Sequence, residues 1–549
     1  MKIYICARKK LTMNQQLLSV FVMALLYSTI SQAQDILWEK SYGGKQADYL
    51  LDAQPTADYG FILAGASLSV KSGNKTEDNQ GDLDYWVWKM DEGGELDWQK
   101  NFGGTSSDIL YSIRNTNDGG FILGGTSNSQ PGIHKKDSCR GKDDFWIIKL
   151  NAKGGEEWQR TIGGSGQEIL KSIAPTKDGG YILGGSSASA VSPKILKGGT
   201  DPYGKSEACR GNMDYWVVRL NEKGEVKWQR TLGGKYADML ESIEQTSDGG
   251  FIIGGHSNSP SSQDKSEDGY GSGDYWVVKL DKDGNTEWEQ VFGGEQDDHL
   301  YIVKQTKDGG YILGGNSASA STGNKSKSNK KGTDIWIIRL DENAKILWQE
   351  TYNTGKTDVL MSLVENTDGT FLLGGYAQTE ATAKQKSDKK EINDYIAIKI
   401  AADGEELWKK AVGSNGEDIL RKLVETRDGG YLLAGTSKGT VSRDRNSGQG
   451  SNDFWVVKLK DKDKKEKKEK RSFLEAIPNP TQQYTNVIVG FEFATGTATV
   501  VDLSGRVLQT FSVNQRTIPV DLGGYSAGIY IIEIKTNAGT DSVKVIKGK

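Results

Sequence analysis

The sequence predicts an all-β fold: a seven-bladed β-propeller with four-stranded blades, followed by a small β-sandwich. The first observation is a period, because tryptophans recur at intervals of 60, 60, 70, 60, 60 and 60 residues, at Trp38, Trp98, Trp158, Trp228, Trp288, Trp348 and Trp408. A fixed period of this length is typical of propellers and solenoids. The second is a strand of the type 85–90, apolar at nearly every position. Such a strand must be covered on both faces, as it is when blades stack around an axis.

The ends of the repeat array indicate how the ring closes. Strand 36–41 precedes the first complete repeat, whereas the seventh repeat ends at Leu459 without a strand of this kind. We therefore expect strand 36–41 to complete the last blade, so that the propeller spans 34–459. Closure removes the exposed sheet edges that an open array would carry.

Within each repeat, Asp-Gly turns such as Asp118-Gly119 predict tight hairpins between four strands. Thirteen of the 14 tryptophans fall at two repeat positions, and we interpret them as packing between blades. The alternative is an array of exposed rings that stacks on sugars. Gly-Gly after an apolar strand is similar to kelch repeats, but this unit is longer and its downstream aromatic spacing differs.

The N-terminal residues 1–33 have the pattern of a secretory signal peptide. Basic residues precede an apolar run at 17–30, and Ser31-Gln32-Ala33 forms a cleavage site. The alternative is an N-terminal membrane anchor. No other stretch approaches transmembrane length, so we expect no transmembrane segment in the mature chain. The formal net charge is −4 with both signs mixed, which argues against a nucleic-acid partner.

The C-terminal part changes character after the last repeat. Residues 460–472 are almost all charged and predict a solvated linker. A membrane-binding basic segment is the alternative, which the interspersed acidic residues disfavour. Residues 473–549 alternate in short strands and predict an immunoglobulin-like β-sandwich.

This tail resembles the C-terminal (type A) sorting domain of cargo proteins of the Bacteroidetes type IX secretion system. The matching residues form an ordered set: Pro478, Asn479, Pro480, Gly505, Arg506, Gly528 and Tyr530. The resemblance implies that the secretion machinery at the outer membrane recognises the tail. It also implies that the protein is secreted or held at the cell surface.

Two cysteines follow the signal peptide, Cys139 and Cys209, in the same Cys-Arg-Gly context of neighbouring repeats. An oxidising destination permits a disulfide between them. Equivalent points on adjacent blades usually lie too far apart for one, so two free thiols are the alternative.

Functional positions are expected on one face, which we call the upper face. It carries the connections between blades and the long loops between second and third strands, which vary between repeats: 67–82, 127–143, 187–214, 257–274 and 317–334. Flexible connectors are the alternative reading of these loops. An acidic residue after each Gly-Gly recurs seven times, which favours a structural role. His256 and His299 come from adjacent blades near this face, and with Asp298 they are our candidate ligand-binding residues.

No pattern indicates catalysis, a metal site or a cofactor. Asp281-Lys282-Asp283-Gly284-Asn285 looks like half of a calcium loop, but it occupies an ordinary hairpin position and lacks the later glutamate. The inner strands offer mostly apolar, Ser and Thr positions. We therefore expect a monomeric, non-catalytic binding or scaffold protein with an unidentified protein or glycan ligand. The alternatives are a propeller glycosidase or lyase and a structural surface-layer component.

Overall fold

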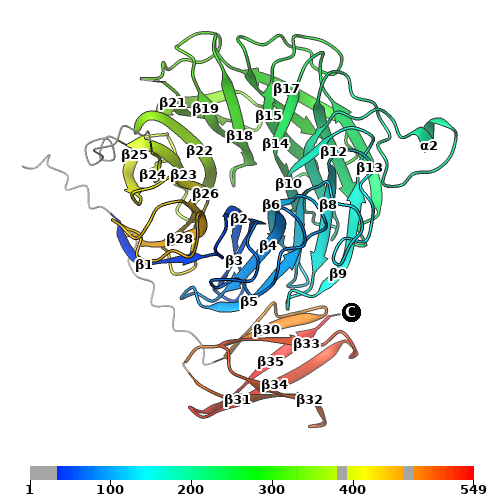
Figure 1. Ribbon diagram of the computed structural model, residues 1–549, viewed down its shortest axis with the longest axis vertical. Coiled ribbons are helices and arrows are strands. Elements are labelled where there is room, and N and C mark those ends of the chain that lie inside the picture. The colour runs from blue at the N-terminus through cyan, green and yellow to red at the C-terminus, as the bar shows by residue number, and fades with distance from the viewer. Residues whose placement is uncertain (1–33, 331, 380–391, 463–473, 492, 549) are drawn as a thin grey trace, which may run out of the picture.

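The computed structural model describes residues 34–330, 332–379, 392–462, 474–491 and 493–548. The predicted signal peptide and most of the predicted linker lie outside the described residues. The described chain forms a ring of sheets with a smaller β domain beside it (Figure 1). Within these ranges, no helix is both long and apolar enough to cross a membrane.

Between residues 34 and 462, the described strands form seven four-stranded antiparallel sheets, which we call blades 1 to 7. In order they are β2–β3–β4–β5 (Asp48–Pro55, Phe61–Ser67, Asp84–Met90, Leu96–Phe102), β6–β7–β8–β9 (Asp108–Asn115, Phe121–Ser127, Asp144–Leu150, Glu156–Ile162), β10–β11–β12–β13 (Glu168–Pro175, Tyr181–Ser187, Asp214–Leu220, Val226–Leu232), β14–β15–β16–β17 (Asp238–Gln245, Phe251–Ser257, Asp274–Leu280, Thr286–Phe292), β18–β19–β20–β21 (Asp298–Gln305, Tyr311–Ser317, Asp334–Leu340, Ile346–Tyr352), β22–β23–β24–β25 (Gly355–Glu365, Phe371–Thr379, Asp394–Ile400, Glu406–Val412) and β26–β27–β28–β1 (Asp418–Glu425, Tyr431–Ser437, Asp453–Lys460, Asp35–Tyr42). The long loop of blade 3 carries the short helix α2 (Pro193–Leu196).

The predicted pairing of the first and last propeller strands is confirmed. Strand β1 runs antiparallel to β28, with Ile36 opposite Leu459 and Tyr42 opposite Phe454. Phe454 of blade 7 in turn packs against Trp86 of blade 1, with ring centroids 4.6 Å apart. The ring therefore closes through main-chain hydrogen bonds between the two ends of the repeat array, and β1 covers the edge that β28 would otherwise expose.

Aromatic pairs hold neighbouring blades together, as expected for the tryptophans. Tyr85 on the third strand of blade 1 lies 4.8 Å from Trp146 of blade 2, and its hydroxyl donates to the Trp146 carbonyl. Equivalent pairs recur around the ring at centroid distances of 4.6 to 4.8 Å: Phe145–Trp216, Tyr215–Trp276, Tyr275–Trp336, Tyr395–Trp455 and Phe454–Trp86. Outer-strand tryptophans such as Trp98 meet the next blade edge-on, here at Phe121. These contacts favour the packing role over exposed sugar-stacking rings.

The hairpin turns opposite the upper face form a second repeated feature, which we call the lower face. In blade 2, Gly119 has φ +82°, and the Thr116 hydroxyl donates to the Asp118 carboxylate. Asp118 also pairs with the buried Lys149 of the third strand, at 2.7 Å between Nζ and Oδ2. The same cation–turn pairing recurs at Lys89, Arg219, Lys279, Arg339, Lys399 and Lys458. The lower face is thus built from nearly identical polar turns.

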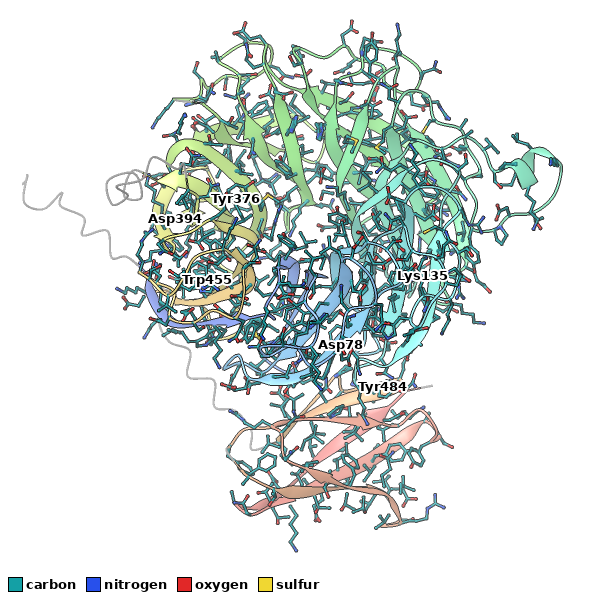
Figure 2. All side chains as sticks on the ribbon, viewed as in Figure 1. Asp78, Lys135, Tyr376, Asp394, Trp455 and Tyr484 are labelled. Carbon is teal, nitrogen blue, oxygen red and sulfur yellow. The ribbon has the colours of Figure 1, made fainter. Side chains whose placement is uncertain are left out.

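The C-terminal domain consists of two sheets around a separate apolar core. One sheet is β29–β30–β33 (Leu474–Ile477, Tyr484–Val489, Thr517–Asp521), and the other is β32–β31–β34–β35 (Val507–Val513, Gly496–Asp502, Gly528–Thr536, Thr540–Lys547). Val487, Val500 and Ile532 are among its fully buried residues. Figure 2 shows Tyr484 on the side of this domain that faces the propeller. Arg516 lies 3.5 Å from Glu92 of the lower face.

Candidate functional site

A central channel runs along the seven inner strands and contains a cavity of about 770 Å³. Each inner strand shifts register after its third residue, as between Leu240 and Ser242 of blade 4. A β-bulge of this kind re-aims the extra residue. The bulged residues all line the cavity: Leu51, Tyr111, Lys171, Glu241, Tyr301, Met361 and Arg421.

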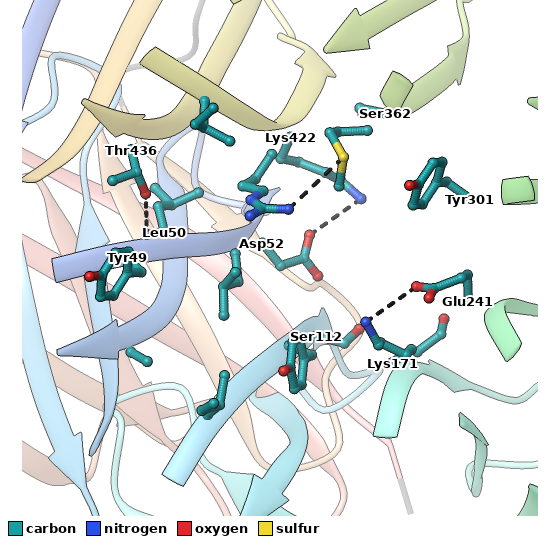
Figure 3. Close-up of a pocket in the computed structure, with 18 of the residues that line it drawn as sticks. Tyr49, Leu50, Asp52, Ser112, Lys171, Glu241, Tyr301, Ser362, Lys422 and Thr436 are labelled. Carbon is teal, nitrogen blue, oxygen red and sulfur yellow. Dashed lines mark hydrogen bonds and ion pairs between the residues drawn. The ribbon is translucent and has the colours of Figure 1, made fainter. Parts of the chain in front are cut away.

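In several blades the residue after the bulge connects one blade to the next. The Ser242 hydroxyl donates to the Val303 carbonyl at 3.2 Å, and the Ser362 hydroxyl donates to the Leu423 carbonyl at 3.0 Å. In blade 1 this position is Asp52, whose carboxylate accepts from the Ile113 amide at 3.0 Å. In blade 7 it is Lys422, which faces Asp52 across the ring closure (Figure 3). The fold therefore uses this ring of positions, but it does not require the same side chain at each.

The channel wall is more charged than the sequence suggested. Six cations and three carboxylates line the cavity: Arg114, Lys171, Lys304, Arg421, Lys422, Lys438, Asp52, Glu241 and Glu417. The expectation that the inner strands offer mostly apolar, Ser and Thr positions was wrong for the side that faces the channel. The expectation averaged over all residues of each inner strand. Side chains alternate between the two faces of a strand, and the bulge re-aims one more of them, so only a few residues of each strand face the channel. The sequence did contain a signal for the channel-facing positions. Their residue types differ from repeat to repeat, whereas most other positions of the repeat carry the same residue type.

The structure brings the two predicted histidines together. The rings of His256 and His299 are stacked with centroids 4.0 Å apart and planes 9° apart. Burial, together with the charges of His299 and Lys171, lowers the pKa of His256 to about 3, so its ring is neutral at physiological pH. Nδ1 of His256 has no hydrogen-bond partner within the described residues, whereas Nε2 of His299 lies 3.5 Å from Asp297 Oδ1.

The position of His256 has a structural task in other blades. There, the equivalent oxygen accepts from the amide of the next blade's inner strand, as Thr436 does from Leu50 at 2.9 Å and Ser186 from Leu240 at 2.9 Å. The histidine stack replaces that hydrogen bond at the junction of blades 4 and 5. The pair is therefore an inter-blade contact near the channel.

The third candidate residue, Asp298, lies in a different environment. Its side chain is fully buried and accepts from the Gly294 amide and the Ser319 hydroxyl, both at 2.8 Å. The other acidic residues of this position each accept in the same way from the amide four residues earlier in the chain: Asp48, Asp108, Glu168, Asp238, Asp358 and Asp418. This hydrogen bonding matches the structural role favoured by the sevenfold repetition, and it turns Asp298 away from solvent.

A second carboxylate lies beside the first at each blade junction. Asp144 and Glu168 form such a pair, and burial followed by the charge of Glu168 raises the pKa of Asp144 to about 7. The glycine between them leaves room for the carboxylate, since a Cβ on Gly163 would lie 2.0 Å from Asp144 Oδ1. Among the described residues, no group of three or more His, Cys, Asp or Glu side chains is arranged to hold a metal ion.

The upper-face loops are anchored at their bases and exposed at their tips. Each of six long loops inserts one buried cation beneath itself: Lys75, Lys135, Lys205, Lys265, Lys325 and Arg445. Lys135, labelled in Figure 2, donates to the Thr161 hydroxyl at 2.7 Å. Six large apolar side chains of upper-face segments are nevertheless 43 to 78% exposed: Val70, Ile133, Leu196, Tyr236, Tyr270 and Val441.

Cys139 and Cys209 are free thiols in the structure. Each donates to a carbonyl of its own blade, Cys139 to Ser127 at 3.0 Å and Cys209 to Ser187. Burial raises the pKa of both thiols to about 11, so neither is an activated nucleophile at neutral pH. Of the two alternatives, the structure therefore has the unbridged one.

The residues of the C-terminal motif fall at turns and at one sheet edge. Asn479, between Pro478 and Pro480, donates to the Lys544 carbonyl at 2.7 Å and accepts from the Ile546 amide at 2.9 Å, so it ties the start of the domain to its last strand. Gly505 has φ +82° in the turn where Arg506 contacts Asp502. Gly528 begins β34, and the hydroxyl of the buried Tyr530 donates to the Ser526 carbonyl.

Residues 475–548 match the family described as the secretion system C-terminal sorting domain. The protein is a cargo protein of the type IX secretion system. Its sorting domain directs export to the cell surface or into the medium, and the type IX machinery recognises that domain.

Other similarities of this cargo protein are distant. Regulatory protein FlaEY of Caulobacter vibrioides is 24% identical over 224 residues, covering 39% of this chain and 23% of that protein. The chain therefore spans about a quarter of that curated relative. The WD40 domain of Neurospora crassa Pan2 has 10% identity and a TM-score of 0.39, covering 78% of this chain and 96% of that one. PorZ of Porphyromonas gingivalis, an essential surface component of the type IX secretion system, has 9% identity and a TM-score of 0.22, covering 96% of this chain and 88% of that one.

Proposed function

We propose that this cargo protein is a non-catalytic binding protein whose upper face engages a protein or glycan partner outside the cell. The observation that carries the proposal is the set of exposed apolar side chains on the upper-face loops. Exposed apolar groups on a rigid frame are typical of interaction surfaces. The buried cations fix the bases of these loops, so the tips are presented by an ordered scaffold and are not free connectors.

The lower face has a nearly constant sequence from blade to blade, whereas the upper face varies, as expected if only the upper face binds a specific partner. The lower-face turns repeat the same Thr-x-Asp-Gly chemistry in most blades, whereas the upper-face loops differ in length and in exposed side chains. Loop variation on a constant scaffold is where binding specificity usually lies. A partner that covers several loops would bury these six apolar residues together.

The alternative is a glycosidase or lyase that uses the channel carboxylates. Asp52 is paired with Arg114 and Lys422, and Glu241 lies 3.5 Å from Lys171. A proton donor and a base must each be available to the substrate in such enzymes. The third channel carboxylate, Glu417, accepts from the Asn393 side chain at 2.8 Å. The ion pairing of Asp52 and Glu241 favours the binding role.

The test uses the secreted protein on glycan arrays and in cross-linking to surface proteins. Ile133→Ser and Tyr270→Ser should each weaken capture of the partner about tenfold, the effect of losing one well-buried anchor. Leu347→Ser, on the outer strand of blade 5, is the matched control and should bind as the wild type does. Equal binding by all three variants would contradict the proposal, and hydrolysis of an arrayed glycan that is lost in Glu241→Gln would favour the enzyme.

A further inference from the structure

The channel wall carries more positive charge than its own carboxylates balance. Its six cations face three carboxylates, although the whole chain has a formal net charge of −4. The excess of positive charge is therefore a local property of the channel wall and does not follow from the average composition of the chain. A low-dielectric concave wall of one sign concentrates ions of the opposite sign.

One buried carboxylate, Asp52, serves two of these cations. Its Oδ2 contacts Arg114 and accepts from the Ile113 amide at 3.0 Å. Its Oδ1 lies 3.3 Å from Lys422 Nζ and accepts from the Ala53 amide at 2.9 Å. Asp52 is thus fully engaged, and neither of its two cations has a second carboxylate as an ion-pair partner in the described chain.

Lys304 adds a third cation to this group. It lies on the inner strand β18 in the cavity wall, and no hydrogen bond or ion pair to a described residue reaches its ammonium group. Burial lowers the pKa of Lys304, with the Arg114 charge acting in the same direction and Glu244 and Asp52 opposing it. Burial, Arg114 and Lys304 together lower the pKa of Lys422 to about 8 despite its contact with Asp52. The three cations are close enough to repel one another, a repulsion that a bound anion would relieve.

The fold itself does not need these cations. Lys304 and Arg114 stand at the same register, where the other inner strands carry Gln54, Ala174, Glu244, Val364 and Val424. At the register of Lys422 four strands carry serine. The blades that lack the cations form the same sheets. The cations therefore have no structural task that recurs around the ring.

We propose that the channel binds an oxyanion, the carboxylate, sulfate or phosphate group of a small ligand, between Arg114, Lys304 and Lys422. Guanidinium and ammonium groups bind such oxygens by charge-assisted hydrogen bonds. The cavity of about 770 Å³ has the size of a small-molecule pocket, and Tyr49, Tyr111 and Tyr301 line it beside the charges. Figure 3 shows Tyr49, Tyr301, Asp52 and Lys422 around this space. The site lies on the channel wall and is independent of the upper-face loops.

The test titrates the purified protein at low ionic strength with sodium sulfate, sodium phosphate and oligogalacturonate, using calorimetry and thermal unfolding. Sodium chloride at equal ionic strength is the salt control. At least one oxyanion should bind and raise the Tm, because a ligand of the native state stabilises it. Binding of the inorganic ions indicates that the group alone suffices, whereas binding of oligogalacturonate alone identifies a sugar acid as the source.

Two substitutions copied from equivalent positions of other blades test the residues. Lys304→Gln copies Gln54 and Lys422→Ser copies Ser112, so both should fold, and each should weaken binding about tenfold or more. Lys153→Gln, the same change of charge on a lower-face turn, should bind as the wild type does. The proposal is overturned if no oxyanion stabilises the protein beyond chloride, or if Lys304→Gln binds like the wild type. Capture of a partner by the upper face should be unchanged in both Lys304→Gln and Lys422→Ser. The channel proposal and the proposed function can therefore fail independently of each other.

Discussion

The blade junctions and the channel wall belong to the same blades but follow different rules. At the junctions, an aromatic pair and two buried carboxylates recur from blade to blade, as at Tyr85 with Trp146 and Asp144 with Glu168. On the channel wall, one bulged position is Leu51, Lys171, Glu241 or Tyr301 depending on the blade. The aromatic pair recurs at six of the seven junctions, and at the seventh Ile335 and Ile396 stand in its place. Positions that recur stack one blade on the next, and positions that differ are free to bind. Four substitutions test this division, from the largest expected effect on stability to the smallest.

Removing a junction tryptophan should have the largest effect. Trp146→Ala empties a fully buried site that packs against Tyr85, and it should lower the free energy of unfolding by about 3–5 kcal/mol. Urea unfolding followed by tryptophan fluorescence and circular dichroism measures it. A loss below about 1 kcal/mol would mean that the aromatic packing at the blade junctions contributes little to the stability of the fold.

Adding one methyl group at a junction should come next. A Cβ on Gly103 would lie 1.9 Å from Asp84 Oδ1, so Gly103→Ala must displace a buried carboxylate and should cost about 1–3 kcal/mol. Gly93→Ala, whose Cβ would lie 3.4 Å from its nearest neighbour in a lower-face turn, is the control and should change stability little. Blade 6 accommodates the junction carboxylate without a glycine. Asn353 stands at the position of Gly103, and its side chain donates to Asp334 Oδ1 at 2.7 Å.

The junction carboxylates should make stability depend on pH. The pKa of Asp144 is raised from its ordinary value of 3.8 to about 7, so between these values the folded chain holds a proton that the unfolded chain has lost. This group therefore favours folding at pH 4, and its contribution falls as the pH rises to 7, by at most about 1.4 kcal/mol per pH unit. Unfolding of Asp144→Asn at pH 4, 5.5 and 7 should show a weaker fall than the wild type. Asp137→Asn, in the long loop of the same blade, should keep the wild-type slope.

Changing the channel wall should affect stability least. Lys304→Gln should shift the free energy of unfolding by no more than about 0.5 kcal/mol in the absence of a ligand, because no hydrogen bond or ion pair to a described residue reaches its ammonium group. The same urea titration measures it. A loss of unfolding free energy as large as that of Trp146→Ala would mean that the channel-wall residues stabilise the fold as much as the junction residues do.

Much of the frame was predictable because it repeats. The 60-residue period, the Asp-Gly turns and the missing strand of the last repeat predicted the sheets and the pairing of strand 36–41 with the last blade. The C-terminal motif predicted the sorting domain. His256 and His299 were paired as candidates because they come from adjacent blades near the upper face, and their rings are stacked. Asp298 was grouped with them by sequence proximity alone, although alternate strand residues point to opposite sides and its side chain is buried at a junction.

By itself, the sequence determined the repeating architecture and the route of export, because periodicity and an ordered terminal motif are properties of the chain as written. Only the tertiary structure decided which charges meet in the channel. Arg114, Lys304 and Lys422 are separated by more than a hundred residues from one to the next, and a bulge in each inner strand selects which side chains reach the axis. Ring closure then places blade 7 beside blade 1, so that Lys422 and Asp52 come within 3.3 Å. Electrostatic interactions act through space, and this spacing exists only after the ring has formed.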